Sequence, residues 1–215
     1  MPATIEKPRD SRSDATRRAL IEAAERLFAD HGFAGVSVRQ IGAAIGSGNN
    51  TVVAYHFGNK DGLIHAIYAH RLPDMDARRG ELLEEIRRDD AEDDLSRVLR
   101  AIWLPLVEFV DADGMHTYAR FLGSILREGL GRTRSAETPD FPNTRKLVAL
   151  AARHMPHKPG VYWTSRWTLA TALILRALHE IDTIHAKASG KAQCDLLFED
   201  AMAMAQAALT APAAQ

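Results

Sequence analysis

A short run of glycines and small polar residues is the clearest candidate for chemistry in this sequence. It reads Gly46-Ser47-Gly48-Asn49-Asn50-Thr51. Glycines let a backbone approach a phosphate closely, and serine, asparagine and threonine side chains can hydrogen-bond to its oxygens. A nucleotide site of this kind also needs a strand before the glycines and either Gly-Lys-Ser/Thr or a third glycine after them. The sequence predicts none of these, so we interpret Gly46 to Gly48 as a tight turn.

The composition indicates one or two globular domains with no overall preference for anions. The 215 residues are 46% hydrophobic and 26% charged, and the formal net charge is −1. Any nucleic-acid binding must therefore come from a local basic patch. The single cysteine, Cys194, excludes an internal disulfide, and no apolar run resembles a signal peptide or a membrane span. We therefore expect a cytoplasmic protein with no membrane partner.

Two helices are predicted before the turn. The first has an apolar stripe at helical spacing and ends at His31-Gly32-Phe33, where glycine suits the left-handed position that follows a helix. The second begins at Ser37, because Gln40 three residues later completes a capping box. Its expected inner face consists of Ile41, Ala44 and Ile45.

A third, short helix is predicted after the turn, from Asn50 to Phe57. Asn49 or Asn50 is its expected N-cap, and Gly58 ends it. Two helices joined by a tight turn form a helix-turn-helix, whose second helix enters the major groove of DNA. With Val53 and Phe57 turned inward, the outward residues are Asn50, Thr51, Val52, Tyr55 and His56.

These outward residues have the chemistry of base readout. An asparagine can pair bidentately with adenine, and the methyl groups of threonine or valine can contact the thymine methyl. Arg39 on the second helix can reach guanine or phosphate. Lys60 adds a positive charge at the start of the next helix, where anions are already favoured.

The remainder of the chain also reads as helical, which predicts an all-α fold. Pro73 is expected to end the fourth helix, and Pro105 is expected to kink a later one. A loop rich in Gly, Thr, Ser and Pro covers residues 131–143. The predicted helices span about 60–71, 75–88, 94–111, 114–130, 144–154, 161–187 and 193–209.

Residues 15–71 resemble the DNA-binding domain of the TetR (tetracycline-repressor-like) transcriptional regulators. The resemblance rests on ALIEAAERLFADHGF, SVRQI and AYHFGNKDGLI, a far more specific signature than a generic helix-turn-helix. Residues 1–12 are polar, proline-containing and basic, and we expect them to form a disordered arm. The resemblance implies a DNA-binding domain over 13–60 and a connecting helix over 60–71. Residues 72–215 would form a helical effector-binding and dimerisation domain.

The resemblance also implies roles for individual residues. Ser37 takes a helix N-cap position that often meets a phosphate, Tyr55 and His56 an aromatic–histidine pair near the backbone, and Lys60 a phosphate-contacting lysine. The chain departs from the family at the turn, which is commonly Ala-Gly-Val-Ser and here is one residue longer, and at Ala54, where tyrosine is common. The candidate DNA-binding residues are Ser37, Arg39, Asn49, Asn50, Thr51, Val52, Tyr55, His56 and Lys60.

In the second domain, the resemblance implies a pocket for an apolar or amphipathic small molecule and a dimer interface. A plain monomer core would use the same residue types, so both interpretations stay open. The candidate pocket residues are Trp103, Leu106, Phe109, Tyr118, Phe121, Leu122 and Ile125. The candidate dimer residues are Ala170, Ile174, Leu178, Ile181, Leu197, Ala201, Met204 and Ala208.

The expected function is that of a DNA-binding transcriptional regulator, a ligand-responsive repressor that binds a near-palindromic operator as a homodimer. We expect no enzymatic activity, because no set of side chains resembles a nucleophile with its base. The histidine spacings do not match a metal site, and no cofactor is expected. The alternative is a helical small-molecule- or metal-binding protein, or an enzyme, with a vestigial helix-turn-helix.

Overall fold

The computed structural model describes residues 11–49, 51–129, 141–155, 160–185 and 191–212. Within these ranges the regular elements are helices and no strand occurs, so the predicted all-α fold is confirmed. The helices are α1 (Ser11–His31), α2 (Val38–Ala44), α3 (Val52–Phe57), α4 (Lys60–Arg88), α5 (Leu95–Glu108), α6 (Thr117–Arg127), α7 (Pro142–Ala152), α8 (Val161–His185) and α9 (Lys191–Thr210).

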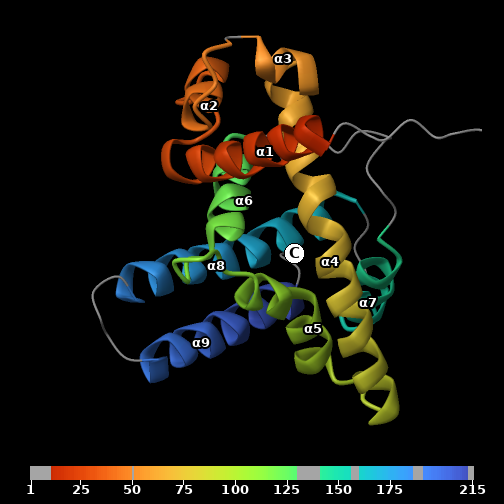
Figure 1. Ribbon diagram of the computed structural model, residues 1–215. Coiled ribbons are helices and arrows are strands. Elements are labelled where there is room, and N and C mark those ends of the chain that lie inside the picture. The colour runs from red at the N-terminus through yellow and green to blue at the C-terminus, as the bar shows by residue number, and fades with distance from the viewer. Residues whose placement is uncertain (1–10, 50, 130–140, 156–159, 186–190, 213–215) are drawn as a thin grey trace, which may run out of the picture.

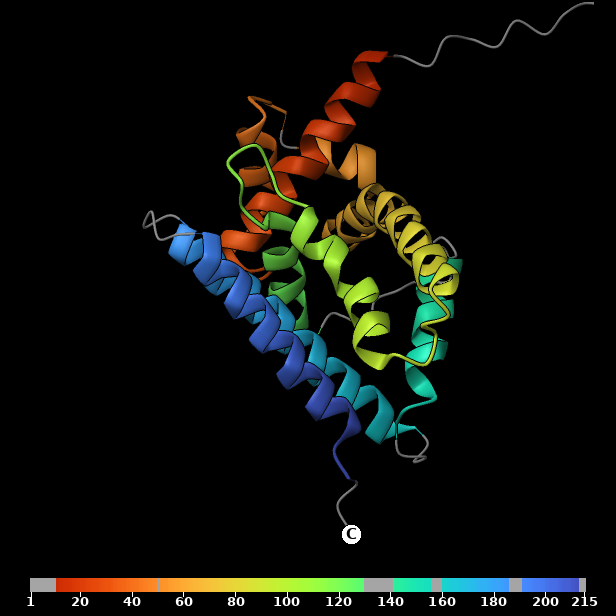
Figure 2. The same cartoon turned by 90° about the horizontal axis from the view of Figure 1, so that it is seen from below.

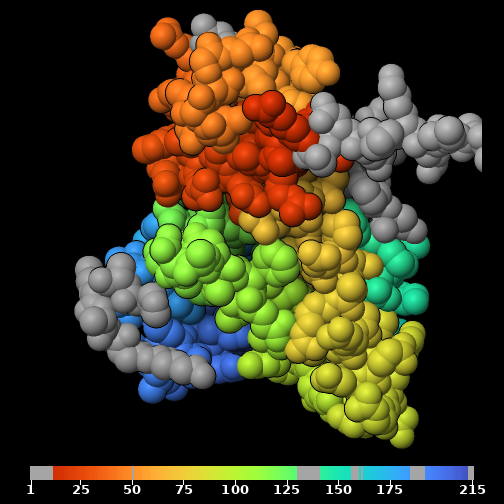
Figure 3. Space-filling view, viewed as in Figure 1, coloured from red at the N-terminus to blue at the C-terminus, as the bar shows by residue number. Residues whose placement is uncertain are grey.

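The helices are arranged as a small N-terminal layer on a larger helical body. Helices α1, α2 and α3 gather at one end, and α4 starts there and runs down to the opposite end (Figure 1). Helices α8 and α9 pack side by side as an antiparallel pair on the far side of the body (Figure 2). The space-filling view shows the N-terminal layer seated directly on α4 and α6 (Figure 3). The layer and the body therefore share one continuous core.

Aromatic side chains form the junction between the layer and the body. The ring of Phe121 on α6 lies 6.2 Å from that of Phe28 on α1 and 5.8 Å from that of Tyr68 on α4. Phe28 and Phe121 are fully buried. Buried aromatic rings contribute large apolar areas and prefer offset or tilted contacts at these distances. Helix α6 is thus packed against the helix that supports α2 and α3.

Helix α4 differs from the prediction, because it continues through Pro73 as one helix of 29 residues. The expected break after residue 71 and the separate helix over 75–88 are wrong. A proline inside a helix removes one backbone hydrogen bond and costs about 3 kcal/mol. Here Leu72 and Met75, on either side of it, are buried in the core. Packing along α1, α5 and α7 keeps the helix continuous across the proline.

The other boundaries lie close to the predicted ones. Helix α1 begins at Ser11, so all but the last two residues of the expected arm 1–12 lie outside the described residues. Most of the expected loop over 131–143 lies outside them as well. Helix α5 includes Pro105 and ends at Glu108. Helix α7 begins two residues before the prediction, at Pro142.

Buried carboxylates fix the starts of α6 and α7. Asp182 on α8 accepts hydrogen bonds from the backbone N–H of His116, at 3.1 Å to each oxygen, and contacts its Nδ1 at 2.6 Å. Asp76 on α4 accepts from the N–H and hydroxyl of Thr144, at 2.8 and 2.6 Å. A carboxylate on the first N–H groups of a helix satisfies donors that have no partner within the helix. Both helices are therefore capped by neighbouring helices.

Candidate nucleic-acid interface

The start of α2 has the predicted capping box. Ser37 is extended, with φ −95° and ψ 153°, and its Oγ accepts a hydrogen bond from the Gln40 N–H at 3.2 Å. In return, the Gln40 Oε1 accepts from the Ser37 N–H at 2.8 Å. The box satisfies two donors at the helix start and fixes the direction in which α2 leaves the preceding turn. Ile41 is buried as expected, whereas Ala44, expected on the inner face, is exposed.

The glycine-rich run is a turn whose polar groups bond to one another. Gly46 has a φ of +71°, and its N–H donates to Ala43 O at 2.9 Å while the Ser47 N–H donates to Gly42 O at 3.0 Å. This pair of bonds with a left-handed glycine is the Schellman end of a helix. The Asn49 Oδ1 then accepts from the N–H and hydroxyl of Thr51, at 2.9 and 2.7 Å. The turn therefore redirects the chain, as predicted, and Asn49 is tied within it.

Helix α3 begins two residues later than predicted. Thr51 occupies the N-cap position and makes no side-chain cap bond, so the expected capping by Asn49 or Asn50 is wrong. Asn49 instead holds the residue that precedes the helix, because its short side chain closes a local turn onto Thr51. Asn50 lies outside the described residues, and its predicted role in base readout stays a prediction.

The two faces of α3 are clearly different. Val53 is fully buried and Phe57 is partly buried against the same core, as predicted. Tyr55 is 80% exposed, and its ring meets that of His56 edge-on at 4.9 Å. Thr51 and Ala54 are also exposed. The short helix thus presents a polar and aromatic surface while two apolar side chains anchor it.

Val52 does not belong to the exposed face. It is partly buried against the core, and it lies so close to Gly42 that a Cβ at Gly42 would be 3.3 Å from the valine Cγ1. The close approach of α2 and α3 places this side chain between the helices. Val52 therefore has a packing contact between α2 and α3, and its contact with bases stays a prediction.

Lys60 also lies elsewhere than expected. Its Nζ donates to Val36 O at 2.7 Å and to Phe33 O, and it lies 3.9 Å from the centre of the Phe33 ring. Burial lowers the pKa of this ammonium group, while the carboxylates of Glu128 and Asp61 oppose the shift. The arrangement contradicts a free cation offered to a phosphate, because the ammonium group is bound to the turn between α1 and α2.

Two arginines supply exposed positive charge around α3. Arg39 on α2 is exposed, as its predicted role requires. Arg17 on α1 is not among the predicted DNA-binding residues. It is exposed and has its Cζ 5.2 Å from the centre of the Phe57 ring. A guanidinium over an aromatic face is held by a cation–π interaction while its donors stay free for anions. The adjacent Arg17-Arg18 pair, three residues before the buried Leu20, was the available signal.

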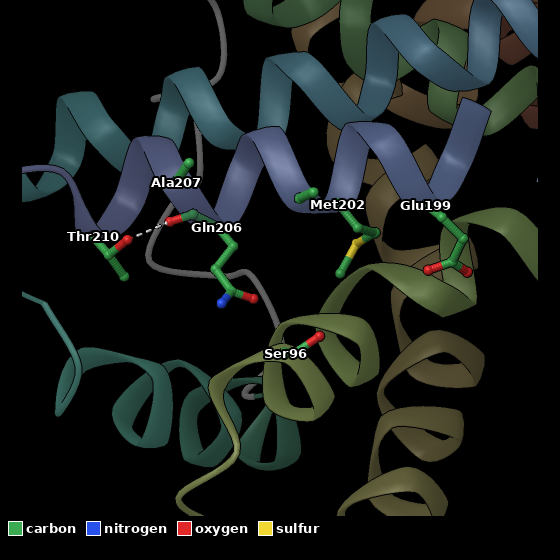
Figure 4. A pocket seen from close by; sticks show the side chains of 7 residues that line it. Ser96, Glu199, Met202, Gln206, Ala207 and Thr210 are labelled. Atoms are coloured by element: carbon green, nitrogen blue, oxygen red, sulfur yellow. Dashed lines mark hydrogen bonds between the residues drawn. The ribbon is translucent and has the colours of Figure 1, made fainter. Parts of the chain in front are cut away.

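The predicted pocket residues are core residues in this structure. Five of them are almost fully buried: Trp103, Leu106, Tyr118, Phe121 and Ile125. Phe109 and Leu122 are partly buried against the same cluster. A different hollow, a groove of about 490 Å³, lies between α5 and α9. Figure 4 shows Ser96 of α5 facing Met202, Gln206 and Thr210 of α9 across it. None of the predicted pocket residues lines this groove.

Most of the predicted dimer residues are buried within the single chain. Ala170, Ile174, Leu178, Ile181 and Ala201 are inaccessible because α8 and α9 face each other and the body with these side chains. Their assignment to a surface between two copies is therefore wrong. Leu197 and Ala208 are partly buried, and Met204 is 47% exposed. The large apolar side chains exposed on this helix pair are Tyr162, Leu169, Leu196 and Met204.

None of the helices in the described ranges is long and apolar enough to span a bilayer. Among the same residues, no three histidine, cysteine, aspartate or glutamate side chains are grouped so that they could hold a metal ion.

A capped helix, a left-handed glycine turn and a short exposed helix seated on a third helix define a helix-turn-helix unit. Residues 20–67 match the model of a family described as bacterial regulatory proteins, tetR family. The match covers the second half of α1, the short helices α2 and α3 and the start of α4, and it confirms the resemblance predicted from the sequence.

The similar proteins are regulators. Over 94 residues the chain is 33% identical to the HTH-type transcriptional repressor AcnR of Corynebacterium glutamicum and 34% identical to AcnR of Corynebacterium efficiens. Each match covers 42% of this chain and 46% of the relative, so the chain spans about half the length of the curated relatives it matches. The crystal structure of the TetR-family regulator PfmR from Thermus thermophilus aligns with a TM-score of 0.42 and 20% identity, covering 91% of this chain and 96% of that one.

Proposed function

We propose that the protein is a sequence-specific DNA-binding transcriptional regulator of the cytoplasm, and that it acts as a ligand-responsive repressor. The exposed face of α3 carries the proposal. Tyr55 projects from a helix that Val53 anchors in the core, next to a turn that aligns it with α2. The family of residues 20–67 and the name repressor borne by the two relatives support the same conclusion.

The interface residues divide into base readers and backbone contacts. Thr51 and Arg39 are exposed, and a threonine methyl group and an arginine guanidinium suit thymine and guanine, respectively. Tyr55, which is 80% exposed, has both an apolar face and a hydroxyl to offer. Ser37, His56 and Arg17 flank this surface and suit phosphates, which fix the register without reading the sequence.

The protein would bind its operator as a homodimer. Helices α8 and α9 expose Leu169, Leu196 and Met204, three apolar side chains that water disfavours. A two-fold axis through this surface would bring two helix-turn-helix units to successive major grooves of a near-palindromic site. The double-stranded operator and a second copy of the chain are thus the expected partners.

The effector would be an apolar or amphipathic small molecule held by the helical body over residues 72–215. The side chains of Trp103 and Phe121 are the expected contacts, and binding would require them to repack, because both are buried. A ligand that favours one arrangement of the helices changes DNA affinity by the same coupling free energy, typically about 1–3 kcal/mol. The effector would weaken operator binding.

The test is selection of bound duplexes from fragments of the source genome, followed by titration of variants on the selected duplex. Tyr55→Ala and Arg39→Ala are expected to weaken binding by about tenfold or more, since one good base contact contributes about 1–3 kcal/mol. Arg87→Ala, which removes a surface arginine at the far end of α4, serves as the control and is expected to bind like the wild type.

Salt dependence separates the two kinds of contact. His56→Ala and Arg17→Ala are expected to lower the slope of log affinity against log salt, because each removes a phosphate contact. Arg39→Ala is expected to relax the selected sequence. If the purified protein enriches no fragment at low salt, the regulator proposal is overturned.

The dimer is tested by measuring mass in solution by light scattering. Leu196→Glu and Leu169→Glu are expected to produce monomers, because each places a charge in the apolar surface of the helix pair. Val110→Glu, at a side chain 48% exposed between α5 and α6, is the matched control and is expected to leave the dimer intact. A wild-type monomer at micromolar concentration would refute this part of the proposal.

A further inference from the structure

The carboxylate of Glu128 connects the end of α6 to the turn between α1 and α2. Its Oε1 accepts a hydrogen bond from the N–H of Phe33 at 2.8 Å, and its Oε2 accepts one from the N–H of Ala34 at 3.1 Å. These amides lie more than ninety residues away in the sequence. A side chain of the helical body thus binds the backbone of the N-terminal layer directly.

The position of this glutamate is unfavourable for α6 itself. Glu128 is the C-cap of α6, where the partial negative charge of the helix end repels a carboxylate. Two backbone N–H donors offset this repulsion, and hydrogen bonds of this kind to a charged acceptor are stronger than those between neutral groups. Gly32, with φ +74°, turns the chain so that both amides face the carboxylate. The contact therefore explains an acidic residue that the helix alone would disfavour.

The same turn is held from its other side by α4. The Nζ of Lys60, at the start of α4, donates to the carbonyl groups of Phe33 and Val36. Glu128 thus binds the N–H groups of the turn and Lys60 binds its carbonyl groups, and the two side chains attract each other electrostatically. Val36 immediately precedes Ser37, whose capping box sets the direction of α2. Any movement of the turn is consequently passed to α2.

Helix α6 makes two further contacts with α1. Arg120 forms an ion pair with Asp30, and Phe121 packs on Phe28. One face of α6 therefore follows the last two turns of α1 and reaches the α1–α2 turn through Glu128. Helix α6 also contacts α8. Helix α6 is in a position to transmit a change in the body to the helix-turn-helix unit.

We propose that Glu128 is a positioning residue that couples α6 to the orientation of α2 and α3. When the carboxylate is bound to the Phe33 and Ala34 amides, α2 is held in the orientation seen here. When a shift of α6 withdraws the carboxylate, the turn and α2 are released. This inference rests on the proposed function for its biological meaning, and it identifies the contact through which an effector would change DNA affinity.

The first experiment needs no DNA. Amide hydrogen exchange is compared between the wild-type protein and Glu128→Ala, which removes both acceptors. Exchange is expected to accelerate at Phe33 and Ala34 and throughout α2, and to stay unchanged in α5. Glu81→Gln, at a surface carboxylate of α4 that bonds to the Arg78 side chain, is the matched control. Unchanged protection of both amides in Glu128→Ala overturns the proposal.

The second experiment uses a duplex selected by the wild-type protein. Glu128→Ala is expected to bind it about tenfold more weakly, with an unchanged slope of log affinity against log salt, because Glu128 meets no phosphate. Glu128→Gln keeps one acceptor and is expected to recover part of the affinity. The coupling is refuted if Glu128→Ala has a reduced salt slope. It is also refuted if amide exchange is faster in this variant but its DNA affinity is unchanged.

The two proposals can fail separately. If the wild-type protein selects no duplex while Glu128→Ala loses protection in α2, the regulator proposal fails and the positioning role stands. If the wild-type protein binds DNA and Glu128→Ala matches it in both exchange and affinity, the positioning role fails alone. Circular dichroism and thermal unfolding of each variant establish that the comparison is made between folded proteins.

Discussion

Arg71 on α4 donates two hydrogen bonds to Glu25 on α1, from Nε to Oε2 at 2.7 Å and from Nη2 to Oε1 at 2.9 Å. The glutamate side chain is only 3% exposed and that of the arginine 23%. A bidentate pair of this kind has a fixed geometry as well as a favourable energy. It fixes α4 against the helix on which α2 and α3 are seated.

Glu25→Ala is expected to lower the free energy of unfolding by about 2–4 kcal/mol, because Arg71 keeps its charge and loses its buried partner. The measurement is urea denaturation followed by circular dichroism. Glu108→Ala breaks a pair with Arg78 in which both side chains are more than a third exposed, and it is expected to cost less than about 1 kcal/mol. Equal effects of the two substitutions would show that burial does not decide the outcome.

Gly62→Ala is expected to displace α3 from α4. A Cβ at Gly62 would lie 2.0 Å from the carbonyl oxygen of Phe57, so the end of α3 must move away. A comparable Cβ at Gly48, in the turn before α3, meets nothing within 4 Å. Gly48→Ala is therefore the control, with a melting temperature close to that of the wild type. Gly62→Ala alone should have a lower melting temperature and a lower affinity for a selected duplex.

Lys60→Met is expected to destabilise the protein by about 1–3 kcal/mol, because the carbonyl groups of Phe33 and Val36 lose a charged donor. Any loss of DNA affinity in Lys60→Met should leave the slope of log affinity against log salt unchanged, because the ammonium group is bound to the turn. A slope reduced by about one would instead identify Lys60 as a phosphate contact.

Asp111 predicts a loss of stability in acid. Partial burial acts to raise the pKa of its carboxyl, but hydrogen bonds from Thr117, Met115 and Asp113 outweigh it and leave that pKa below its ordinary value. A carboxyl with a lowered pKa stabilises the folded state above the pKa of the unfolded chain, and this contribution disappears as pH falls through the folded pKa.

The measurement for Asp111 compares the wild type with Asp111→Asn. The difference in melting temperature should be largest near neutral pH and should shrink below about pH 4. A difference that stays constant from neutral pH to about pH 3 would show that the charge of Asp111 contributes nothing.

Local signals predicted the helix-turn-helix unit well. The capping box at Ser37 and the left-handed glycine at Gly46 act within a few residues, so the sequence shows them directly. Pro73 was misread because a proline signals the end of a helix locally, whereas the packing that keeps α4 continuous comes from residues far along the chain. Local pattern and tertiary contact disagree at that residue.

The candidate sites depended more on contacts that sequence spacing does not show. Helical spacing gave Ile174 and Leu178 an apolar face, but it could not tell whether that face meets α9 of the same chain or a second copy. Lys60 was assigned from a motif, and only the fold shows that its ammonium group turns toward the α1–α2 turn. Arg17 was not predicted, because only the folded chain brings this residue of α1 close to Phe57 of α3.

The continuity of α4 has a mechanical consequence. A helix of 29 residues rises about 1.5 Å per residue and is therefore roughly 43 Å long. A tilt of α4 by about 5° about its Arg88 end would therefore displace Lys60, beside α3, by roughly 4 Å. A break at Pro73 would have absorbed such a tilt halfway. With the unbroken helix, a shift near the middle of α4 would be about doubled at Lys60, next to α3.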